Sequence, residues 1–204
     1  MKSLLLAGGR SSRMGRDKAL IEIDGLPMIT RVVKALVGAG KEPIRIAVSS
    51  PEKMEDYAAV IDSNYDIEWV LDSIQHAGPV DAIIENLKDP LCLQEESIQL
   101  ATVDVPWITA EFFTSLEGSI SKSDEVIIPT DGDVLHPLLS LVRPKLLINS
   151  LESWDGGPLH EMFQKIPHSF LMVESRLINN INTPNELHKY AGGYKLIPKV
   201  DHTE

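Results

Sequence analysis

The amino-acid sequence predicts an α/β protein with three layers, in which a mostly parallel central sheet has helices on both faces. The main observation is an alternation along the chain. Short apolar runs, typical of buried strands, are followed by longer segments whose apolar residues recur at helical spacing. The chain length agrees with this class, because 204 residues, of which 43% are hydrophobic, suffice for one domain with a sizeable core.

Five apolar runs are predicted to be strands of this sheet. They lie at residues 3–7, 44–50, 67–72, 97–104 and 125–129. Four segments between these runs have the period of a helix. They lie at residues 28–40, 51–61, 77–88 and 109–116.

Proline, glycine and threonine residues mark the ends of several predicted helices. Pro27 is placed to begin the first helix, and Gly38 and Gly40 are placed to end it. Pro51 lies in the first turn of the second helix, where a helix needs no N–H donor. Thr109 is predicted to be the N-cap of the fourth helix.

The pattern changes after about residue 130. Residues 131–143 predict one or two strands, residues 143–154 a helix and residues 168–175 a late strand. No serine- or glycine-rich linker, charge block or internal repeat separates this region from the rest of the sequence. We therefore predict a single domain over residues 1–204, with a C-terminal elaboration that lies as an insertion over the sheet.

Composition and charge exclude several classes of protein. Nineteen Lys and Arg residues against 30 Asp and Glu residues give a net charge of −11, which disfavours general nucleic-acid binding. The single cysteine, Cys92, allows no intrachain disulfide, and the first residues lack the pattern of a signal peptide. Every apolar run is shorter than the roughly 18 residues of a membrane span. We expect a soluble, cytoplasmic protein.

The loop after the first strand combines glycines with basic residues. In a parallel α/β sheet, ligands bind beyond the carboxyl ends of the strands, so this loop is a place to expect one. Glycines let backbone N–H groups approach an anion, and basic side chains neutralise it, which indicates a phosphate site rather than a solvated surface loop. The loop contains Gly8, Gly9, Arg10, Arg13, Gly15, Arg16, Asp17 and Lys18.

The spacing in this loop differs from the standard phosphate motifs. It matches neither G-x-x-x-x-G-K-[ST] nor G-x-G-x-x-G, so it is neither a P-loop nor a dinucleotide fingerprint. The residues around Ser11 also lack the last glycine of a G-x-S-x-G nucleophile elbow, which disfavours a serine hydrolase.

The segment LAGGRSSRMGRDKALIEIDGLPMI, residues 6–29, resembles the N-terminal signature of nucleotidyltransferases of the nucleotide-diphospho-sugar-transferase type. Its core, Arg-Met-Gly-x-Asp-Lys-Ala-Leu, most resembles the molybdenum cofactor guanylyltransferases. Further segments of the chain resemble later segments of that family. They are Asp72 with residues 77–80, then residues 102–106, 136–138 and 180–184. The resemblance implies a Rossmann-like nucleotidyltransferase fold.

The resemblance also implies a reaction, in which GMP passes from GTP to the terminal phosphate of molybdopterin or Mo-molybdopterin and pyrophosphate is released. The implied cofactor is Mg²⁺. The implied partners are GTP, the pterin acceptor and other molybdenum cofactor delivery proteins. Because a phosphate acceptor is already ionised near neutral pH, catalysis depends mainly on alignment and on neutralising charge at the phosphate oxygens.

The same resemblance assigns roles to individual residues. Those expected to be catalytic are Arg13, Lys18 and Asp104. Those expected to bind the nucleotide are Leu6, Ala7, Gly8, Gly9, Gly15, Lys18, Asp72 and Asp104. The backbone N–H groups from Leu6 to Gly9 are expected to approach the nucleotide, and Asp104 to bind Mg²⁺. Those expected to bind the acceptor are His136, Asn180 and Asn182.

Several of these residues have a second interpretation. Asp72 is a candidate for nucleotide or indirect metal contact, or for capping the turn that follows it, and Asp104 is also a candidate cap. His136 is a substrate-orienting residue or an ordinary loop histidine. Asn180 and Asn182 either pair with a pterin edge or form an Asx turn before Pro184.

Two other functions compete with guanylyl transfer. One is a nucleotidyltransferase that uses CTP, UTP or ATP on a sugar phosphate or another pterin, because the loop recognises phosphate and not the base. The other is a nucleotide-binding module without turnover, although the presence of both Lys18 and Asp104 argues against it. In the favoured interpretation, the chain up to Asp104 binds GTP and residues 136–184 bind the acceptor independently.

Overall fold

The computed structural model describes residues 1–8, 17–72, 78–154 and 156–190. The strands in these ranges are β1 (Ser3–Leu6), β2 (Glu22–Ile23), β3 (Leu26–Pro27), β4 (Ile44–Val48), β5 (Ile67–Leu71), β6 (Ile98–Thr102), β7 (Val126–Thr130), β8 (Leu141–Val142) and β9 (His168–Met172). The helices are α1 (Met28–Gly38), α2 (Pro51–Ala58), α3 (Pro79–Leu87), α4 (Pro90–Gln94), α5 (Ala110–Ser119), α6 (Pro144–Glu152), α7 (Leu159–Phe163), α8 (Ser175–Ile178) and α9 (Pro184–Tyr190). Two single 3-10 turns are η1 (Lys18–Leu20) and η2 (Pro137–Leu139).

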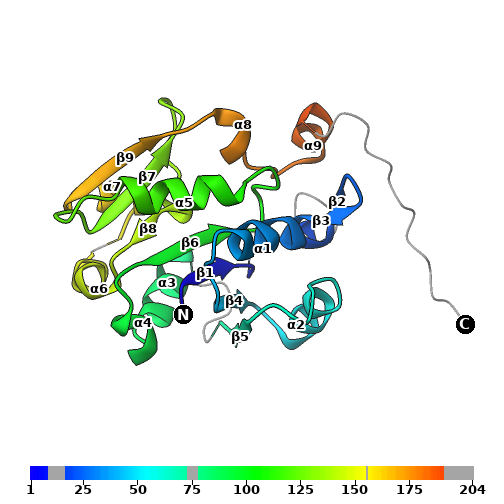
Figure 1. Ribbon diagram of the computed structural model, residues 1–204, viewed down its shortest axis with the longest axis horizontal. Helices are drawn as coiled ribbons and strands as arrows, with labels where there is room; N and C mark the ends of the chain where they lie inside the picture. Colours follow the sequence, from blue (N-terminus) through cyan, green and yellow to red (C-terminus); the bar gives the residue numbers. More distant parts are fainter. Residues whose placement is uncertain (9–16, 73–77, 155, 191–204) are drawn as a thin grey trace, which may run out of the picture.

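Seven of the strands form one sheet in the order β5-β4-β1-β6-β8-β7-β9, and helices surround it (Figure 1). Every neighbouring pair is parallel except the two pairs that involve β8. This topology confirms the predicted fold class. Because β1 lies between β4 and β6, the loop that follows β1 leaves the sheet near its middle.

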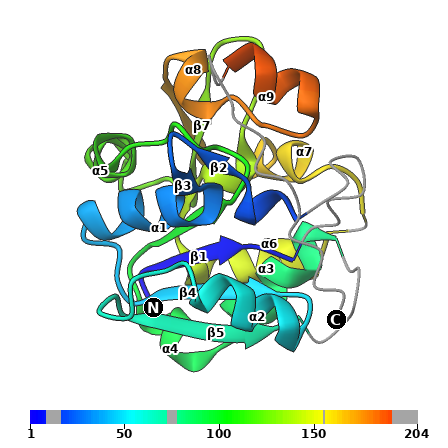
Figure 2. The same ribbon diagram turned by 90° about the vertical axis from the view of Figure 1, so that its right-hand side faces the viewer.

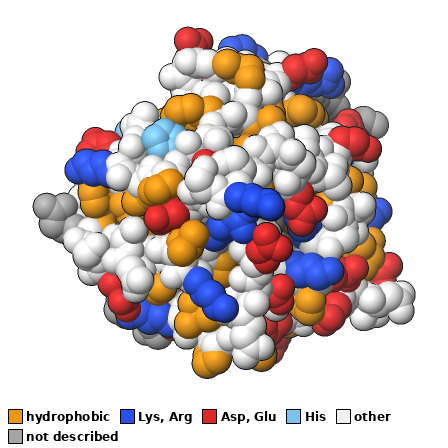
Figure 3. Space-filling view, turned by 60° about the vertical axis from the view of Figure 1, so that its left-hand side comes forward, with side chains coloured by type: hydrophobic (Ala, Val, Ile, Leu, Met, Phe, Trp, Pro, Cys, Tyr) orange, Lys and Arg blue, Asp and Glu red, His pale blue; other side chains and the backbone are white. Residues whose placement is uncertain are grey.

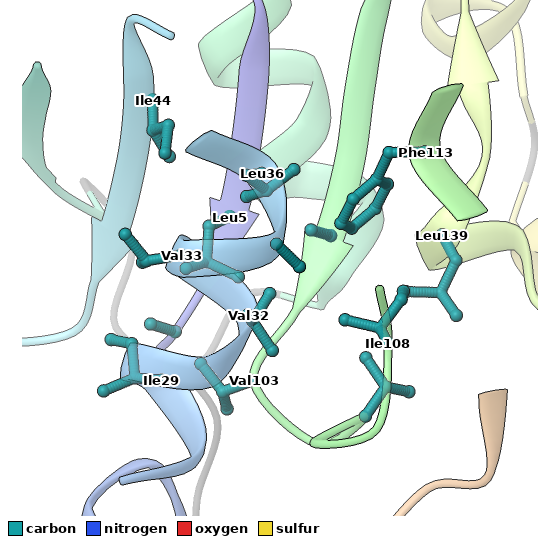
Figure 4. Packing of buried hydrophobic residues seen from close by; sticks show 14 of the residues in the cluster. Leu5, Ile29, Val32, Val33, Leu36, Ile44, Val103, Ile108, Phe113 and Leu139 are labelled. Carbon is teal, nitrogen blue, oxygen red and sulfur yellow. The ribbon is translucent and has the colours of Figure 1, made fainter. Parts of the chain in front are cut away.

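One face of the sheet is covered by α1, α2, α5 and α8. Helix α1 contributes an apolar stripe at helical spacing, which packs on alternate residues of the strands (Figure 4). Members of this core shown in Figure 4 are Leu5, Ile29, Val32, Val33, Leu36, Ile44, Val103, Ile108, Phe113 and Leu139.

The other face is covered by α3, α4, α6 and α7. Strand residues adjacent to those of the first core supply it, as Leu4 beside Leu5 and Val126 beside Ile127 illustrate. Figure 2 shows α1 and α5 on one side of the molecule and α3, α6 and α7 on the other. The two cores explain why the central strands read as continuous apolar runs rather than as alternating ones.

The helix-end signals agree with the structure. Pro27 occupies the N-cap position of α1, which ends at Gly38, and Gly40 has a positive φ of 68°. Pro51 lies in the first turn of α2. The hydroxyl of Thr109 accepts a hydrogen bond from the N–H of Phe112 and caps α5.

Part of the C-terminal region enters the sheet, which corrects the expectation that it lies as an insertion over it. Strand β8 pairs antiparallel with β6 and β7, and β9 extends the sheet beyond β7. The sequence signal is weak for both, because β8 has only two residues and β9 is an edge strand with half-buried and exposed side chains. The β2–β3 hairpin was not predicted, although Asp24-Gly25, with φ values of 51° and 76°, is a hairpin turn signal.

A third, small apolar cluster joins two segments that are far apart in the sequence. Residues from η1 to α1 pack there against residues that lie just before and within α9, with Trp107 beside them. Its buried members are Ile21, Ile23, Met28, Ile181 and Leu187. In Figure 1, the β2–β3 hairpin and α9 accordingly lie at the same end of the molecule.

None of the helices in the described ranges combines the length and the apolar character that a membrane span needs. On the face of the molecule drawn in Figure 3, acidic and basic side chains are interspersed among apolar and neutral ones.

Candidate active site

Three of the predicted site residues lie where parallel strands end. Gly8 follows β1, Asp72 follows β5 and Asp104 follows β6. The carboxyl ends of parallel strands meet at one edge of a sheet, so these three positions face a common region.

Asp72 packs against the backbone of Gly8. A Cβ atom added to Gly8 would collide with Oδ2 of Asp72 and would lie 3.7 Å from the backbone nitrogen of Ser49. Within the described ranges, Oδ1 of Asp72 is buried without a hydrogen-bond partner. Burial, together with the charge of Glu85, raises the pKa of Asp72, and Lys53 opposes this shift. A carboxylate in this position costs stability and can be satisfied by a donor from a ligand.

Lys18 connects two distant parts of the chain. Its Nζ lies 3.1 Å from Oδ2 of Asp104 and 3.0 Å from Oδ1 of Asn182. Both charged side chains keep a solvent-accessible part, with 17% of Lys18 and 19% of Asp104 exposed. Asp104 and Asn182 lie 86 and 164 positions after Lys18 in the sequence, so only the tertiary fold brings the three residues together.

Asp104 is held on both sides. The hydroxyl of Thr102 donates a hydrogen bond to Oδ1 of Asp104, and the N–H of Ile181 donates to the Asp104 carbonyl oxygen at 2.8 Å. The first contact orients the carboxylate, and the second ties the segment before α9 to the end of β6. Asp104 is therefore a fixed, partly exposed oxygen donor at the ligand-binding edge of the sheet.

Asn182 precedes the cap of α9. The Glu186 carboxylate accepts hydrogen bonds from the N–H groups of Asn182 and Thr183 at 2.7 and 2.9 Å, and the Thr183 hydroxyl accepts from the Glu186 N–H at 3.2 Å. The Asn182 side chain points instead to Lys18. This contact rules out a purely local Asx turn for Asn182. It also places Asn182 beside the lysine predicted to bind GTP, so we expect the two half-sites to be coupled, and their independence stays to be tested by binding measurements.

His136 and Asn180 lie in the same C-terminal region but make different contacts. His136 is half-buried at the start of η2, and its N–H donates to the carbonyl of Pro129 at 2.9 Å. Burial lowers the pKa of His136, while the negative charges of Asp131 and Asp104 oppose the shift. Asn180 is exposed. A neutral His136 can both donate and accept hydrogen bonds.

The predicted backbone donors are only partly available. Leu6 lies within β1, and the N–H of Ala7 donates to the carbonyl of Ala47 at 2.9 Å. The sheet therefore uses the Ala7 amide, which corrects the expected role of that N–H. Gly9, Arg13 and Gly15 lie outside the described residues.

Among the described residues, those around Asp104 include donors for a divalent cation but no complete set of protein ligands. No group of three or more His, Cys, Asp or Glu residues with metal-binding geometry occurs in the described parts of the chain. Mg²⁺ does not require such a cage, since it typically uses one or two carboxylates and takes its other oxygens from water and phosphate. Asp104 is a hard oxygen donor with an accessible face, so this donor set fits Mg²⁺ bound together with a phosphorylated substrate.

Two elements of the site were missed at the level of sequence. Thr102 orients Asp104, and the spacing of two residues between a threonine and an aspartate is a signal that could have indicated this bond. Asp17 accepts hydrogen bonds from the N–H of Ala19 and from the hydroxyl of Tyr57. Asp17 and Tyr57 are 40 positions apart, so no local pattern in the sequence could have indicated the contact between them.

Comparison with known proteins identifies the family. Residues 3–169 match the model of the MobA-like NTP transferase domain. The chain is 31% identical over 137 residues to a probable molybdenum cofactor guanylyltransferase from Opitutus terrae, with 67% of this chain and 63% of that protein covered. It is 25% identical to a protein of the same description from Flavobacterium johnsoniae, with 92% of this chain and 94% of that protein covered.

A solved structure has the same fold. The molybdopterin-guanine dinucleotide biosynthesis protein A from Archaeoglobus fulgidus superposes with a TM-score of 0.71 at 21% identity, covering 94% of this chain and 97% of that chain. The family match extends from β1 to the first residues of β9, and it includes Lys18 and Asp104 but not Asn182. The chain belongs to the MobA-like NTP transferase domain family and is a nucleotidyltransferase.

Proposed function

We propose that this nucleotidyltransferase moves GMP from GTP to the terminal phosphate of molybdopterin, or of Mo-molybdopterin, in an Mg²⁺-dependent reaction that releases pyrophosphate. The names of the relatives from Opitutus terrae and Flavobacterium johnsoniae support the choice of substrates. We treat residues 1–204 as one domain, with the region from about residue 130 supplying acceptor contacts. We expect the reaction in the cytoplasm, together with other cofactor delivery proteins.

The observation that carries the proposal is the contact of Lys18 with both Asp104 and Asn182. It joins a cation suited to phosphate, a carboxylate suited to a divalent metal and an amide suited to a polar acceptor. The contacts of the ammonium group with Asp104 and Asn182 are single hydrogen bonds at a partly exposed position, so a triphosphate can replace them without unfolding the surroundings.

In the proposed reaction, an oxygen of the acceptor phosphate attacks the α-phosphorus of GTP. A new phosphorus–oxygen bond forms, the bond between the α-phosphorus and the bridging oxygen breaks, and pyrophosphate leaves with that electron pair. Lys18 stabilises the charge that grows on the leaving oxygens, and Asn182 keeps Lys18 directed at them. Asp104, fixed by Thr102, would hold Mg²⁺, which when bound neutralises phosphate charge as a Lewis acid.

The neutral state of His136 supports a role toward the acceptor. A half-buried imidazole with a lowered pKa carries less positive charge near neutral pH, so it competes little with Lys18 for the triphosphate. It can also donate or accept a hydrogen bond at the polar edge of a pterin. Asn180 is available for the same kind of contact because its side chain is exposed. Asp72 is proposed to accept a hydrogen bond from the nucleotide, since its buried Oδ1 has no donor in the described ranges.

The direct test is to incubate the protein with GTP, Mg²⁺ and molybdopterin and to detect the guanine dinucleotide by mass. Parallel reactions with CTP, UTP and ATP test the base, and omission of Mg²⁺ tests the metal. We expect the guanine product with GTP alone among the four nucleotides. Preferential use of CTP would indicate a different nucleotidyltransferase, and calorimetric GTP binding without turnover on any acceptor would indicate a binding module.

A further inference from the structure

The turn that presents Lys18 is short. Lys18 begins η1, a single 3-10 turn, and Asp17 occupies its N-cap position. Oδ1 of Asp17 accepts a hydrogen bond from the N–H of Ala19 at 3.0 Å. A single 3-10 turn has few internal hydrogen bonds of its own, so its conformation depends on contacts from outside the turn. The position of Lys18 therefore depends on how firmly Asp17 is held.

Asp17 is held from helix α2. The hydroxyl of Tyr57 donates a hydrogen bond to Oδ2 of Asp17 at 2.8 Å, and Nζ of Lys53 lies 3.3 Å from the same oxygen. Oδ1 of Asp17 therefore caps η1, and Oδ2 contacts side chains of α2. The lysine contact is partly exposed and weak, so the tyrosine contact is the more rigid of the two.

Tyr57 is suited to hold a carboxylate in one place. It is 0% exposed, belongs to the core beneath α1 and is the single buried residue of α2. Burial, followed by the neighbouring Asp17, raises the pKa of Tyr57, so the hydroxyl remains a donor at neutral pH. The packed ring therefore determines where the hydroxyl lies, and the hydroxyl determines where Asp17 lies.

We propose that Tyr57 is a positioning residue for nucleotide transfer, acting through Asp17 on Lys18. Its hydroxyl fixes the cap of η1 and keeps the Asp17 carboxylate from turning toward the ammonium group of the next residue. Lys18 is thereby left to its contacts with Asp104 and Asn182, and then with phosphate. This inference rests on the proposed function, because it takes Lys18 to be the lysine that binds the triphosphate.

The test is the variant Tyr57→Phe, which removes the hydroxyl and keeps the buried ring. Tyr65→Phe is the matched control, because Tyr65 is a half-buried tyrosine that packs on the same core. We expect Tyr57→Phe to lower kcat/KM for GTP about tenfold, as for a lost hydrogen bond to a charged group, and Tyr65→Phe to change it less than about twofold. Urea unfolding of both variants checks that the proteins assayed are folded.

A double-mutant cycle separates positioning from general damage to the fold. If Tyr57 acts through Lys18, Tyr57→Phe changes kcat/KM less than about twofold in a Lys18→Ala background. An equal loss of about tenfold in both backgrounds would overturn the proposal. No loss in the wild-type background would overturn it as well.

Hydrogen exchange gives a measurement that does not depend on substrates. We expect exchange of the Ala19 amide to accelerate about tenfold in Tyr57→Phe and to be unchanged in Tyr65→Phe, because Asp17 loses one of its anchors. If the wild-type protein makes no guanine dinucleotide, the proposed function fails on its own. In that case the exchange rate of the Ala19 amide still tests whether Tyr57 holds Asp17 in place. An exchange rate that is unchanged in Tyr57→Phe would overturn this positioning role.

Discussion

Two cations of this protein, Arg45 and Lys18, each form hydrogen bonds with acidic or amide side chains from distant segments. They differ in the exposure of the side chain and in the geometry of these bonds. Arg45 lies in β4 with 4% of its side chain exposed. Its guanidinium donates two hydrogen bonds to Glu68 at 2.7 and 2.9 Å and one to Asp89 at 2.7 Å. These bonds raise the pKa of Arg45 although burial opposes the shift.

Lys18 has a different set of contacts. Its ammonium makes one bond each to Asp104 and Asn182, at the ligand-binding edge of the sheet and with 17% of the side chain exposed. A planar guanidinium in a bidentate pair is fixed by geometry, whereas an ammonium on a flexible stem can exchange partners. From this comparison we expect the buried, multiply bonded Arg45 to stabilise the fold and the more accessible Lys18 to bind a ligand.

The largest effect on turnover is expected from Asp104→Asn. The amide is nearly isosteric but removes the charge that would hold Mg²⁺ against the triphosphate, so kcat should fall by a factor on the order of 1000 while unfolding in urea changes little. Asp66→Asn is the control, because Asp66 is an exposed aspartate before β5, at the opposite edge of the sheet. Near-normal turnover of Asp104→Asn at saturating Mg²⁺ would remove Asp104 from the metal site.

Lys18→Ala should have the next largest effect on turnover. Loss of a charge that stabilises the leaving pyrophosphate is expected to lower kcat/KM for GTP about 100-fold. Lys34→Ala removes an exposed lysine from α1 and should leave kcat/KM within about twofold of wild type. If both variants lose activity equally, Lys18 supplies only diffuse attraction, and its contrast with Arg45 has no functional meaning.

Arg45→Met should affect the fold and leave the chemistry intact. The variant leaves Glu68 and Asp89 unpaired, but these side chains are 44% and 30% exposed and can be hydrated. We expect the free energy of unfolding to fall by about 2 kcal/mol, less than for a fully buried pair, with turnover per folded molecule unchanged. Arg176→Met, at an exposed position in α8, is the control in urea unfolding. A loss of turnover in the folded Arg45→Met protein would contradict the assignment of Arg45 to the fold alone.

Asn182→Ala should reduce GTP binding about fivefold in calorimetry without acceptor, because Lys18 loses the neutral hydrogen bond that directs it. Asn180→Ala, at an exposed position nearby, should leave GTP binding unchanged and raise only the KM for molybdopterin. Equal GTP affinity in the two variants would restore independent binding of nucleotide and acceptor.

The smallest effect is expected from Asp72→Asn, and it is a gain of stability. The pKa of Asp72 is raised in the folded protein, so ionising this carboxyl costs folding free energy as the pH rises from its unfolded-state pKa through its folded-state pKa. Removing the charge should stabilise the protein by about 1 kcal/mol or less at pH 7, with no gain below the unfolded-state pKa. Urea unfolding at pH 7 and at a pH below the unfolded-state pKa measures the change in free energy of unfolding, with Asp66→Asn as control. Destabilisation at pH 7 would mean that Asp72 has a structural partner.

Local patterns in the sequence determined most of the fold and the location of the site. Apolar runs identified β1, β4, β5, β6 and β7, because these strands, apart from the largely half-buried β5, are buried along most of their length. Apolar residues at a period of 3.6 identified the long helices, because one face of each helix is buried. Thr109 and Pro51 marked helix starts because caps act over three or four residues. The glycine-rich loop after β1 and the aspartates after β5 and β6 indicated the ligand-binding edge, because parallel strands place their ends together.

Only the tertiary structure decided which side chains meet. The contacts of Lys18 with Asp104 and Asn182, and of Asp17 with Tyr57, join residues 40 to 164 positions apart. In the third apolar cluster, the segment that contains Asn182 packs against the residues after Lys18, so this cluster likewise joins residues 21–28 to residues 181–187. The entry of β8 and β9 into the sheet depends on pairing partners and not on their own two to five residues. Such contacts depend on how the helices pack on the sheet, so a periodic pattern within one segment cannot predict them.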